Sequence, residues 1–455
     1  MKVMKFGGAC LSTPENFLKV SEIIKSQEEK VIVVVSAISG ITDMLFKALD
    51  IALRFENKIE EILKKIQKKH EFIINKTIFR EEIRKRVKRR IKYKLKKLER
   101  LLYGIAYTEE LTDSIKANVL SYGERFSAII LSEVLIQNDK KAIAFESEKL
   151  GIVTDDSFEN ATANLNETKL NFERRLIPLL NKGFIPVITG YYGCTKEGKI
   201  TTFGRNGSDY SAAIATYATN SPVLEIWKDV NGFMSADPKV VKNARKIDKL
   251  SYYEAAELSY FGARILHPRT VEPLSGLKTK IIIKNFHENR DKGTLILQKG
   301  YKKENVIKSV TFNKNIAVLR IYGPGVGYKP GIIGEIGKVL SRKGINIYSI
   351  LTSQTCINLL LDKRDSLRSY QTVKQLCNGI IEKINLVEEI ALVAVVGEGL
   401  KEEKGIAAKI FASVAKENVN VEMISMGASE VASYFIIKET DIEKVINAIH
   451  NEFFP

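Results

Sequence analysis

The chain has 455 residues, of which 45% are hydrophobic and 27% are charged, and this composition is typical of a soluble globular protein with two or three domains. It has no run of about eighteen apolar residues and opens on a strand-like VMKF, so we expect a cytoplasmic protein without a membrane span or signal peptide. The four cysteines are widely separated, which excludes a CxxC zinc site and gives no sign of a disulfide framework.

The basic residues are concentrated in one segment. The net charge is +17, and residues 58–100 hold 18 Lys and Arg against 6 Glu, a local charge of +12. Apolar residues recur there at three- and four-residue steps and predict an amphipathic helix over about residues 76–100: Ile83, Val87, Ile91, Leu95, Leu98 and Leu102. We expect this stripe to pack on a neighbouring element and the basic face to lie in solvent. A nucleic-acid interface is the alternative, but only Tyr93 and Tyr103 could supply the aromatic contacts that such interfaces use.

The N-terminal part alternates between short apolar runs and helical patterns. Residues 3–6 and 31–36 are rich in β-branched side chains, and each is followed by a turn with Gly and then a helix. Thr13 and Pro14 predict a helix start, with Thr13 as the N-cap. After a helical excursion over about residues 43–118, strands are expected at 141–145, 185–189, 223–227 and 280–284. Residues 1–297 are therefore expected to form one α/β domain with an open, mainly parallel sheet sandwiched by helices.

The C-terminal part contains an internal repeat. A Lys-rich stretch, 298–308, reads as a linker, and two βαββα patterns follow it. The first has strands at 316–321, 345–351 and 357–362 and helices at 332–343 and 367–384. The second has strands at 390–396, 419–424 and 432–437 and helices at 405–418 and 442–453. KGINIYSILTSQ in one copy matches ENVNVEMISMGAS in the other, a pattern that resembles tandem ferredoxin-like ACT domains. We expect them over 309–389 and 390–455, with strands free to interleave between the two.

The turn after the first strand is a candidate phosphate site. Lys5-Phe6-Gly7-Gly8 combines a cation with glycines that let backbone N–H groups approach an anion closely. A plain tight turn remains an equally simple interpretation of this motif by itself. The motif is neither a P-loop nor a G-x-G-x-x-G fingerprint, so the common nucleotide-binding folds are not supported.

Polar loops follow other predicted strands. The loop Ser36 to Thr42 leaves the second strand at the same sheet end as KFGG, where ligands of open α/β sheets bind, although it could also be a turn capped by Thr42. Glu124, in SYGER, begins a helical pattern, and an acidic residue at that place is common for structural reasons alone. The loop 201–211 is more informative, because Arg205, Ser208 and Asp209 offer a carboxylate fork, a hydroxyl and an anion. His267, before Pro268, is interpreted as structural.

Six motifs occur in the order found in aspartate kinases of the amino acid kinase family: KFGG, VVVSA, SYGER, FGRNGSDYSA, EIW-DV-G with Ala236-Asp237-Pro238, and SYYEAAELSYFGARILHPRT. The resemblance covers nearly the whole chain. FGRNGSDYSA and the last motif are specific to aspartate kinases, whereas KFGG alone also fits acetylglutamate or uridylate kinases. The resemblance implies an enzyme that uses ATP and Mg²⁺ to convert L-aspartate into 4-phospho-L-aspartate, the first step of lysine, threonine and methionine biosynthesis.

The resemblance also implies a role for each matching position. Lys5 looks like the lysine that stabilises the transferring phosphoryl group, and Asp209 like the aspartate that holds the catalytic cations in place. The implied catalytic residues are Lys5, Asp209 and Arg264. Those implied to bind aspartate are Ser36, Thr42, Glu124, Tyr191, Arg205 and Ser208, with Arg205 on the α-carboxylate and Glu124 on the ammonium. Those implied to bind the nucleotide are Gly7, Gly8, Lys228, Asp229, Met234, Lys239 and Arg264, and no residue is assigned to a metal.

The sequence departs from the family pattern mainly on the nucleotide side. The family usually has Thr at Lys228, Tyr at Met234, Arg at Lys239 and Lys at Arg264, and Ala9-Cys10 replaces a usual Thr-Ser. Tyr191 stands where the family usually has Phe. These substitutions largely keep the charge of the nucleotide site but change the geometry of its side chains, so we expect the details of ATP binding to differ from the family pattern.

The ACT pair implies regulation. Such domains commonly bind lysine or threonine at an interface between paired ACT domains, and Ser353, Gln354 and Thr355 occupy the expected loop. A homodimer or higher homo-oligomer through these domains is implied. A monofunctional enzyme is expected, because no room follows residue 455 for a homoserine dehydrogenase domain. The alternative is a regulatory binding protein with a kinase fold and impaired catalysis, against which Lys5, Arg205 and Asp209 argue.

Overall fold

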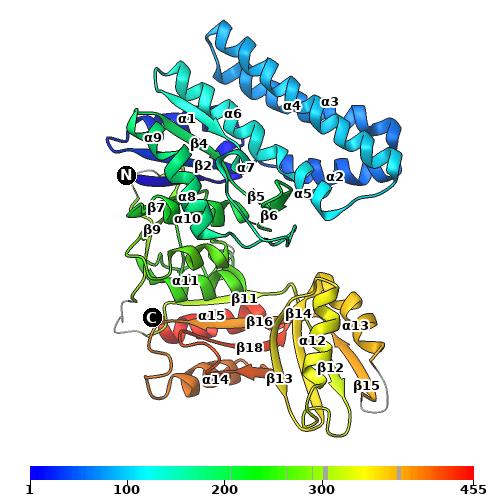
Figure 1. The fold of residues 1–455 in the computed structure, drawn as a ribbon. Helices are drawn as coiled ribbons and strands as arrows, with labels where there is room; N and C mark the ends of the chain where they lie inside the picture. Colours follow the sequence, from blue (N-terminus) through cyan, green and yellow to red (C-terminus); the bar gives the residue numbers. More distant parts are fainter. Residues whose placement is uncertain (205, 264, 289–290, 301–305, 377–380) are drawn as a thin grey trace. The chain divides into compact units, whose positions relative to one another are not determined.

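The computed structural model describes residues 1–204, 206–263, 265–288, 291–300, 306–376 and 381–455 (Figure 1). Residue contacts divide the chain into two compact units. The first comprises Met1–Phe233, Lys246–Ala256 and Ile265–Gly300, and the second comprises Met234–Arg245, Glu257–Arg264 and Tyr301–Pro455. The predicted range 1–297 therefore includes two short stretches whose contacts are made with the C-terminal unit.

An eight-stranded sheet forms the centre of the first unit, in the order β3-β4-β2-β1-β7-β9-β10-β8. Neighbouring strands are parallel except for β9 and β10, which are antiparallel. The strands are β1 (Lys2–Phe6), β2 (Val31–Val35), β3 (Ala142–Phe145), β4 (Ile185–Thr189), β7 (Val223–Lys228), β8 (Lys249–Ser251), β9 (Lys280–Asn285) and β10 (Thr294–Leu297). A separate hairpin pairs β5 (Tyr192–Cys194) with β6 (Ile200–Thr202). The predicted open, mainly parallel sheet is confirmed.

Helices cover both faces of this sheet (Figure 1). On one face, Met4 and Phe6 share a core cluster with Phe17 and Phe126, which come from two helices. Alternate residues of β1 point to the other face, where a third helix packs against β1 and β7. Outside the helical excursion, the α-helices from the N-terminus to α11 are α1 (Pro14–Lys25), α6 (Tyr122–Gln137), α7 (Ser147–Leu150), α8 (Leu165–Arg175), α9 (Ile177–Asn181), α10 (Gly207–Ala218) and α11 (Tyr252–Leu258). The helix start at Thr13 is confirmed, since its hydroxyl accepts a hydrogen bond from the Asn16 N–H at 3.2 Å.

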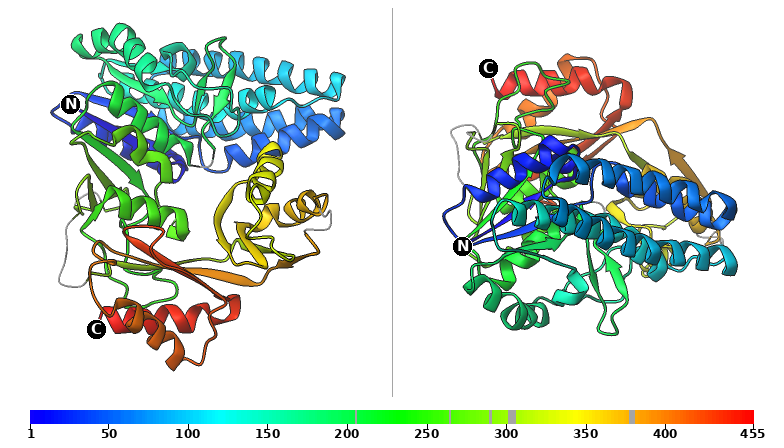
Figure 2. Two further views of the ribbon diagram at one scale, coloured as in Figure 1. Left: turned by 60° about the horizontal axis from the view of Figure 1, so that its bottom comes forward. Right: turned by 90° about the horizontal axis from the view of Figure 1, so that it is seen from above.

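The predicted helical excursion comprises α2 (Ile41–Arg54), α3 (Ile59–Thr77), α4 (Glu81–Thr108) and α5 (Asp113–Leu120). Figure 2 shows α3 and α4 as long helices lying side by side. All six residues of the predicted apolar stripe on α4 are buried, as expected of a helix packed on α2, α3 and α6. Part of the basic face of α4 is neutralised by α6, because Arg86 and Arg90 both pair with the buried carboxylate of Glu133 on that helix.

The second unit contains two four-stranded sheets, in the orders β11-β16-β18-β17 and β13-β14-β12-β15. The strands of the first are β11 (Ser309–Asn313), β16 (Ile390–Val396), β17 (Met423–Ser425) and β18 (Ala432–Lys438). Those of the second are β12 (Ile316–Tyr322), β13 (Ile347–Thr352), β14 (Cys356–Asp362) and β15 (Lys383–Val387). The helices are α12 (Ile332–Arg342), α13 (Ser366–Lys374), α14 (Ile406–Lys416) and α15 (Ile442–Phe453). The predicted pair of small ferredoxin-like domains is confirmed.

Three details of this unit differ from expectation. The helix expected over 367–384 ends at Lys374, and Lys383–Val387 form β15 on the edge of β12. The strand expected over 419–424 is reduced to Met423–Ser425. Ser309–Asn313, at the start of the range assigned to the first ACT domain, pairs with β16 in the sheet of the second. The first and third outcomes depend on a strand partner distant in sequence, which local patterns do not specify.

Two stretches inserted between strands of the first unit belong to the second by their contacts. Within the 234–245 stretch, the Ser235 carbonyl accepts a hydrogen bond from the Val310 N–H at 2.8 Å, and Val241 lies in a core cluster with Ile449 of α15. Among the described residues, no helix is long and apolar enough to cross a membrane.

Candidate active site

The carboxyl ends of β1, β2 and β7 meet at one edge of the sheet, because these strands are parallel neighbours. The Gly7 N–H donates to the Trp227 carbonyl at 3.1 Å, so the KFGG turn lies directly beside the end of β7. A Cβ on Gly8 would come within 3.0 Å of the Ala37 carbonyl oxygen, in the loop after β2. Three segments far apart in the sequence are therefore packed together where the sequence placed the phosphate site.

Two lysines converge on one buried carboxylate at this edge. Lys5 Nζ lies 2.6 Å from Asp209 Oδ1, and Lys228 Nζ lies 2.9 Å from Asp209 Oδ2. The register sets both lysines on the same face, because Phe6 pairs with Trp227 and side chains alternate along each strand. Asp209 comes from the first turn of α10, whose N-terminal dipole favours a negative charge. The site therefore carries two ammonium groups for one carboxylate.

Asp209 is held in its ionised form. Burial alone would raise the pKa of this carboxyl, but the Lys228 and Lys5 ammonium groups outweigh it and hold the pKa well below its usual range. The backbone N–H of His267 also donates to Asp209 Oδ2, at 3.3 Å. Burial lowers the pKa of His267 to about 4, so its ring is neutral at pH 7 and accepts a hydrogen bond from the Arg269 N–H. His267 thus contributes to the site through its backbone.

A second buried acid lies beside the loop after β2. Glu124 of α6 accepts a hydrogen bond from the Ala37 N–H at 2.9 Å through Oε1, whereas Oε2 has no hydrogen-bond partner among the described residues. Burial raises the pKa of Glu124 to about 8. A buried carboxylate oxygen without a partner is costly unless a ligand supplies a donor. The geometry suits a ligand ammonium group at Oε2.

The other predicted acceptor residues lie on loops and helix starts around Glu124. Ser36 directly follows β2 and Thr42 is the second residue of α2, and both are half-buried. Tyr191 has a left-handed φ of 76°, which is unusual for a residue other than Gly. Burial and the nearby Glu124 carboxylate raise the pKa of Tyr191, so its phenol stays protonated. Ser208 is buried against Gly190, where a Cβ would come within 2.7 Å of the Ser208 Cβ.

Not every predicted site residue belongs to this cluster. Arg205 and Arg264 lie outside the described residues. Asp229 follows Lys228 and is exposed. Met234 and Lys239 belong to the second unit, where the Met234 carbonyl accepts from the Ser309 hydroxyl at 2.8 Å.

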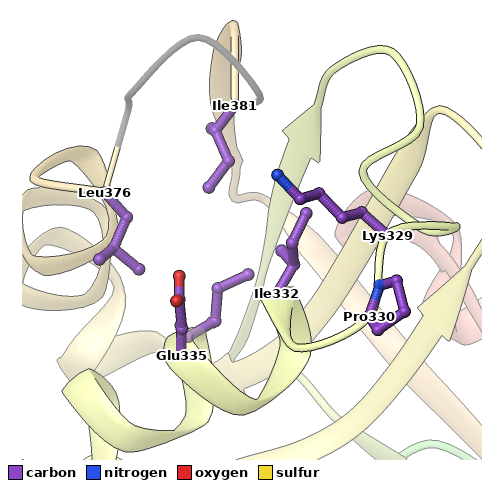
Figure 3. A pocket seen from close by; sticks show the side chains of 7 residues that line it. Lys329, Pro330, Ile332, Glu335, Leu376 and Ile381 are labelled. Carbon is purple, nitrogen blue, oxygen red and sulfur yellow. The ribbon is translucent and has the colours of Figure 1, made fainter.

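The predicted effector residues form a turn in the second unit. Ser353, Gln354 and Thr355 are exposed between β13 and β14. The Gln354 and Thr355 carbonyls accept hydrogen bonds from Gly327 and Gly323, in the loop before α12. A cavity of about 150 Å³ lies elsewhere in this unit, lined by Lys329, Pro330, Ile332, Glu335, Ile336, Leu376 and Ile381. Figure 3 shows the apolar side chains facing one another across it, with the ends of Lys329 and Glu335 reaching the same space. None of the three predicted effector residues lines this cavity.

Two contributors to the site were not identified from the sequence as functional. The His267 N–H on Asp209 has no sequence signal, because every residue except Pro carries an N–H group. The Ala37 N–H on Glu124 is the same kind of contact. Both become visible only when the loops are placed in space.

Comparisons with known proteins identify the family of this chain. The amino acid kinase family model matches residues 1–285, and an ACT domain model matches residues 393–453. A bifunctional aspartokinase/homoserine dehydrogenase of Buchnera aphidicola is 31% identical over the whole chain, which spans 56% of that relative's length. Aspartokinase 1 of Arabidopsis thaliana, a chloroplast protein, is 30% identical over 99% of the chain and 80% of its own length.

Two solved structures of Escherichia coli aspartokinase III match all of this chain and are themselves matched in full. The complex with aspartate and ADP, in the R-state, has a TM-score of 0.87 at 27% identity. The complex with lysine and aspartate, in the T-state, has a TM-score of 0.81 at 28% identity. The chain therefore belongs to the amino acid kinase family, and within it to the aspartokinases.

Proposed function

We propose that this protein transfers the γ-phosphoryl group of ATP to the side-chain carboxylate of L-aspartate and so makes 4-phospho-L-aspartate. The observation that carries the proposal is the Lys5–Asp209–Lys228 cluster beside Glu124, with its unpartnered oxygen. The E. coli relative solved with aspartate and ADP supports the same pair of ligands.

The acceptor is held by complementary charges. Glu124 Oε2 receives the ammonium of aspartate, and Arg205 binds the α-carboxylate in the bidentate manner that suits a guanidinium. Ser36, Thr42, Tyr191 and Ser208 complete the pocket. The side-chain carboxylate of aspartate is already ionised at pH 7, so it needs no general base. The proposal therefore gives His267, whose ring accepts from the Arg269 N–H, no catalytic role.

The donor side neutralises phosphate charge. An oxygen of the aspartate carboxylate forms a bond to the γ-phosphorus as the bond to the β–γ bridging oxygen breaks, and ADP leaves with that electron pair. Lys5 and Lys228 stabilise the negative charge on the transferring group and on the leaving oxygen, while Asp209 keeps both ammonium groups in place. Gly7 and Gly8 allow the phosphates to approach the backbone. Asp229, Met234, Lys239 and Arg264 bind the rest of the nucleotide.

Magnesium enters with the nucleotide in this proposal. Both oxygens of Asp209 are engaged by lysines, and the described residues contain no group of three or more potential metal-ligating side chains. Magnesium commonly keeps several waters and binds through substrate phosphates, so a protein site with few ligands is compatible with it. When bound, Mg²⁺ would neutralise further charge on the phosphates.

The C-terminal unit regulates the reaction through an end-product amino acid. Lysine is the first candidate, because it occupies the T-state complex of the E. coli relative, and threonine is the second. We place the effector at Ser353, Gln354 and Thr355, in a homo-oligomer assembled through the ACT domains. Regulation requires lysine to prefer one of two global states of the protein.

A hydroxamate assay tests the proposal. With aspartate and Mg-ATP, the acyl phosphate should be trapped by hydroxylamine, and added lysine should reduce the yield more than threonine does. Product with another amino acid or a nucleoside monophosphate, but none with aspartate, would refute the proposed reaction. Lysine binding without any phosphoryl transfer would favour a purely regulatory protein.

A further inference from the structure

The segment 36–42, which comprises the loop after β2 and the first two residues of α2, is held by a side chain from the helical excursion. Lys69 of α3 donates a hydrogen bond from Nζ to the Ser39 carbonyl oxygen at 2.5 Å, across 30 residues of sequence. Lys69 is half-buried, and within the described part of the chain its ammonium forms no ion pair with a carboxylate. Its polar contact is therefore with the backbone of the acceptor loop.

The next residue of α3 contacts α6, the helix that carries Glu124. His70 is fully buried and directs Nδ1 to the Ile66 carbonyl at 2.7 Å. Its ring packs edge-on against Phe126, with the ring centroids 4.6 Å apart. Phe126 lies two residues after Glu124 on α6. Consecutive residues of α3 thus touch the loop that carries Ser36 and Thr42 and the helix that carries Glu124.

The tip of the loop is a turn closed by a hydrogen bond from the Ile41 N–H to the Ile38 carbonyl at 2.9 Å, and Lys69 adds a side-chain hydrogen bond to it. Ser39 and Gly40 are exposed, and Gly40 has a left-handed φ of 76°. The base of the loop is packed tightly, because a Cβ on Gly123 would lie 2.6 Å from the Ala37 Cβ and one on Gly8 would lie 3.0 Å from the Ala37 carbonyl. Ser39 lies two residues after Ala37, whose N–H donates to Glu124. The position of the loop tip and the geometry of the pocket are therefore linked.

We propose that Lys69 is a positioning residue for aspartate: it fastens the loop 36–42 so that Ser36, Thr42 and Glu124 keep the spacing that the acceptor requires. This inference rests on the proposed aspartate pocket. It gives the helical excursion a role in substrate binding, through α3, that is separate from the basic face of α4.

Two matched substitutions test it in the full-length protein. Lys69→Met removes the charge and the donor while keeping the length of the side chain. Lys68→Met makes the same change one residue earlier, where the side chain is exposed and no contact with the loop is described. Lys69→Arg retains charge and donors and serves as the conservative variant.

The kinetic expectation is a split between the two substrates. In Lys69→Met, the KM for aspartate should rise roughly three- to ten-fold, with the KM for ATP within about two-fold of the wild type, as lost positioning of one substrate predicts. Lys69→Arg should restore most of the effect, and Lys68→Met should have none. Equal KM values for aspartate in Lys69→Met and Lys68→Met would overturn the proposal.

Hydrogen exchange of the free protein separates the contact from the activity. Peptides covering residues 36–44 should exchange several-fold faster in Lys69→Met than in Lys68→Met, because the loop opens more often. Two results would indicate that Lys69 only attracts aspartate over a long distance, and either would overturn the positioning role. One is a raised KM for aspartate with unchanged hydrogen exchange, and the other is a rise in the KM for aspartate that disappears at high salt. Faster exchange with an unchanged KM would also overturn it. Wild-type protein without aspartate-dependent turnover would instead refute the proposed function, while the exchange comparison would still report on the Lys69 contact.

Discussion

At the scale of single residues, the cluster around Asp209 brings two ammonium groups to one buried carboxylate. Lys5 and Lys228 share one carboxylate, so removal of either ammonium leaves the site nearly neutral and the phosphates less stabilised. Lys228 stands where the family usually has an uncharged Thr. The structure therefore gives this chain a second lysine next to the one that the motif KFGG supplies.

Lys228→Met should lower kcat for the aspartate reaction by roughly 100-fold, since the loss of one preorganised group that stabilises transition-state charge costs about 100- to 1,000-fold. Lys228→Arg should recover part of this loss. Lys284→Met is a matched control, because Lys284 is also a strand lysine near a carboxylate, 3.7 Å from Glu225. Steady-state kinetics with varied ATP and aspartate measure the effect. A kcat for Lys228→Met within about three-fold of the control would contradict a role in transfer.

Glu124 makes aspartate binding dependent on pH. Burial raises the pKa of its carboxyl to about 8, so below pH 8 the free protein holds it mainly protonated and neutral. The ammonium of aspartate pairs with the ionised form, so binding must displace that proton. The KM for aspartate should therefore fall as pH rises from 6.5 towards 8, by up to about ten-fold per pH unit, and level off above 8.

The measurement is the KM for each substrate between pH 6.5 and 9. The KM for ATP should not follow the same curve, because Asp209 remains ionised throughout this range. Glu124→Gln should raise the KM for aspartate and remove its pH dependence. A KM for aspartate that is flat across pH 8 in the wild type would show that Glu124 does not bind the ammonium in its ionised form.

At the scale of elements, the features that depend on residues close together in the sequence were predicted correctly. The Thr13 cap, the α4 stripe and the end of α15 at Phe453 depend on residues within a few turns of one another, and all three are observed. The shortened α13 and the placement of β11 in the other sheet depend on distant strands. In both cases the structure is decided by hydrogen bonds to a strand far away in the sequence, and no local sequence pattern predicts such pairing.

The same distinction holds for the candidate site. Lys5 and Asp209 lie in motifs and could be identified from them, and the structure brings them within 2.6 Å of each other. Lys69 could not be found in this way, because it lies in a run of lysines with no motif. Its contact depends on how α3 returns over the loop after β2.

At the scale of the whole molecule, the second unit includes a segment that the proposal assigns to nucleotide binding. The chain leaves the first unit after Phe233 and returns at Lys246, and the stretch between contains Met234 and Lys239. Its hydrogen bonds are made within the second unit: Ser235 Oγ lies 2.8 Å from His450 Nε2 on α15 and accepts from the Arg245 N–H, also at 2.8 Å. Asn447 Nδ2 donates to the Val240 carbonyl at 3.3 Å. The stretch that carries Met234 and Lys239 is thus fixed within the second unit.

His450→Phe tests whether this anchoring matters for catalysis. Phe can keep the stacking on Phe454 but removes the contact between His450 and the buried Ser235 hydroxyl, which keeps only the Arg245 N–H as its partner, and the loss of one buried hydrogen bond typically costs about 1–3 kcal/mol. The segment should loosen, so the KM for ATP should rise roughly two- to five-fold while the KM for aspartate stays constant. Adding Ser235→Ala to His450→Phe also removes the acceptor of the Arg245 N–H, so the double variant should be less stable than His450→Phe alone. Unfolding by heat should register the loss of stability in both variants. An unchanged KM for ATP, in a variant that is measurably destabilised, would show that nucleotide binding does not depend on the 234–245 segment.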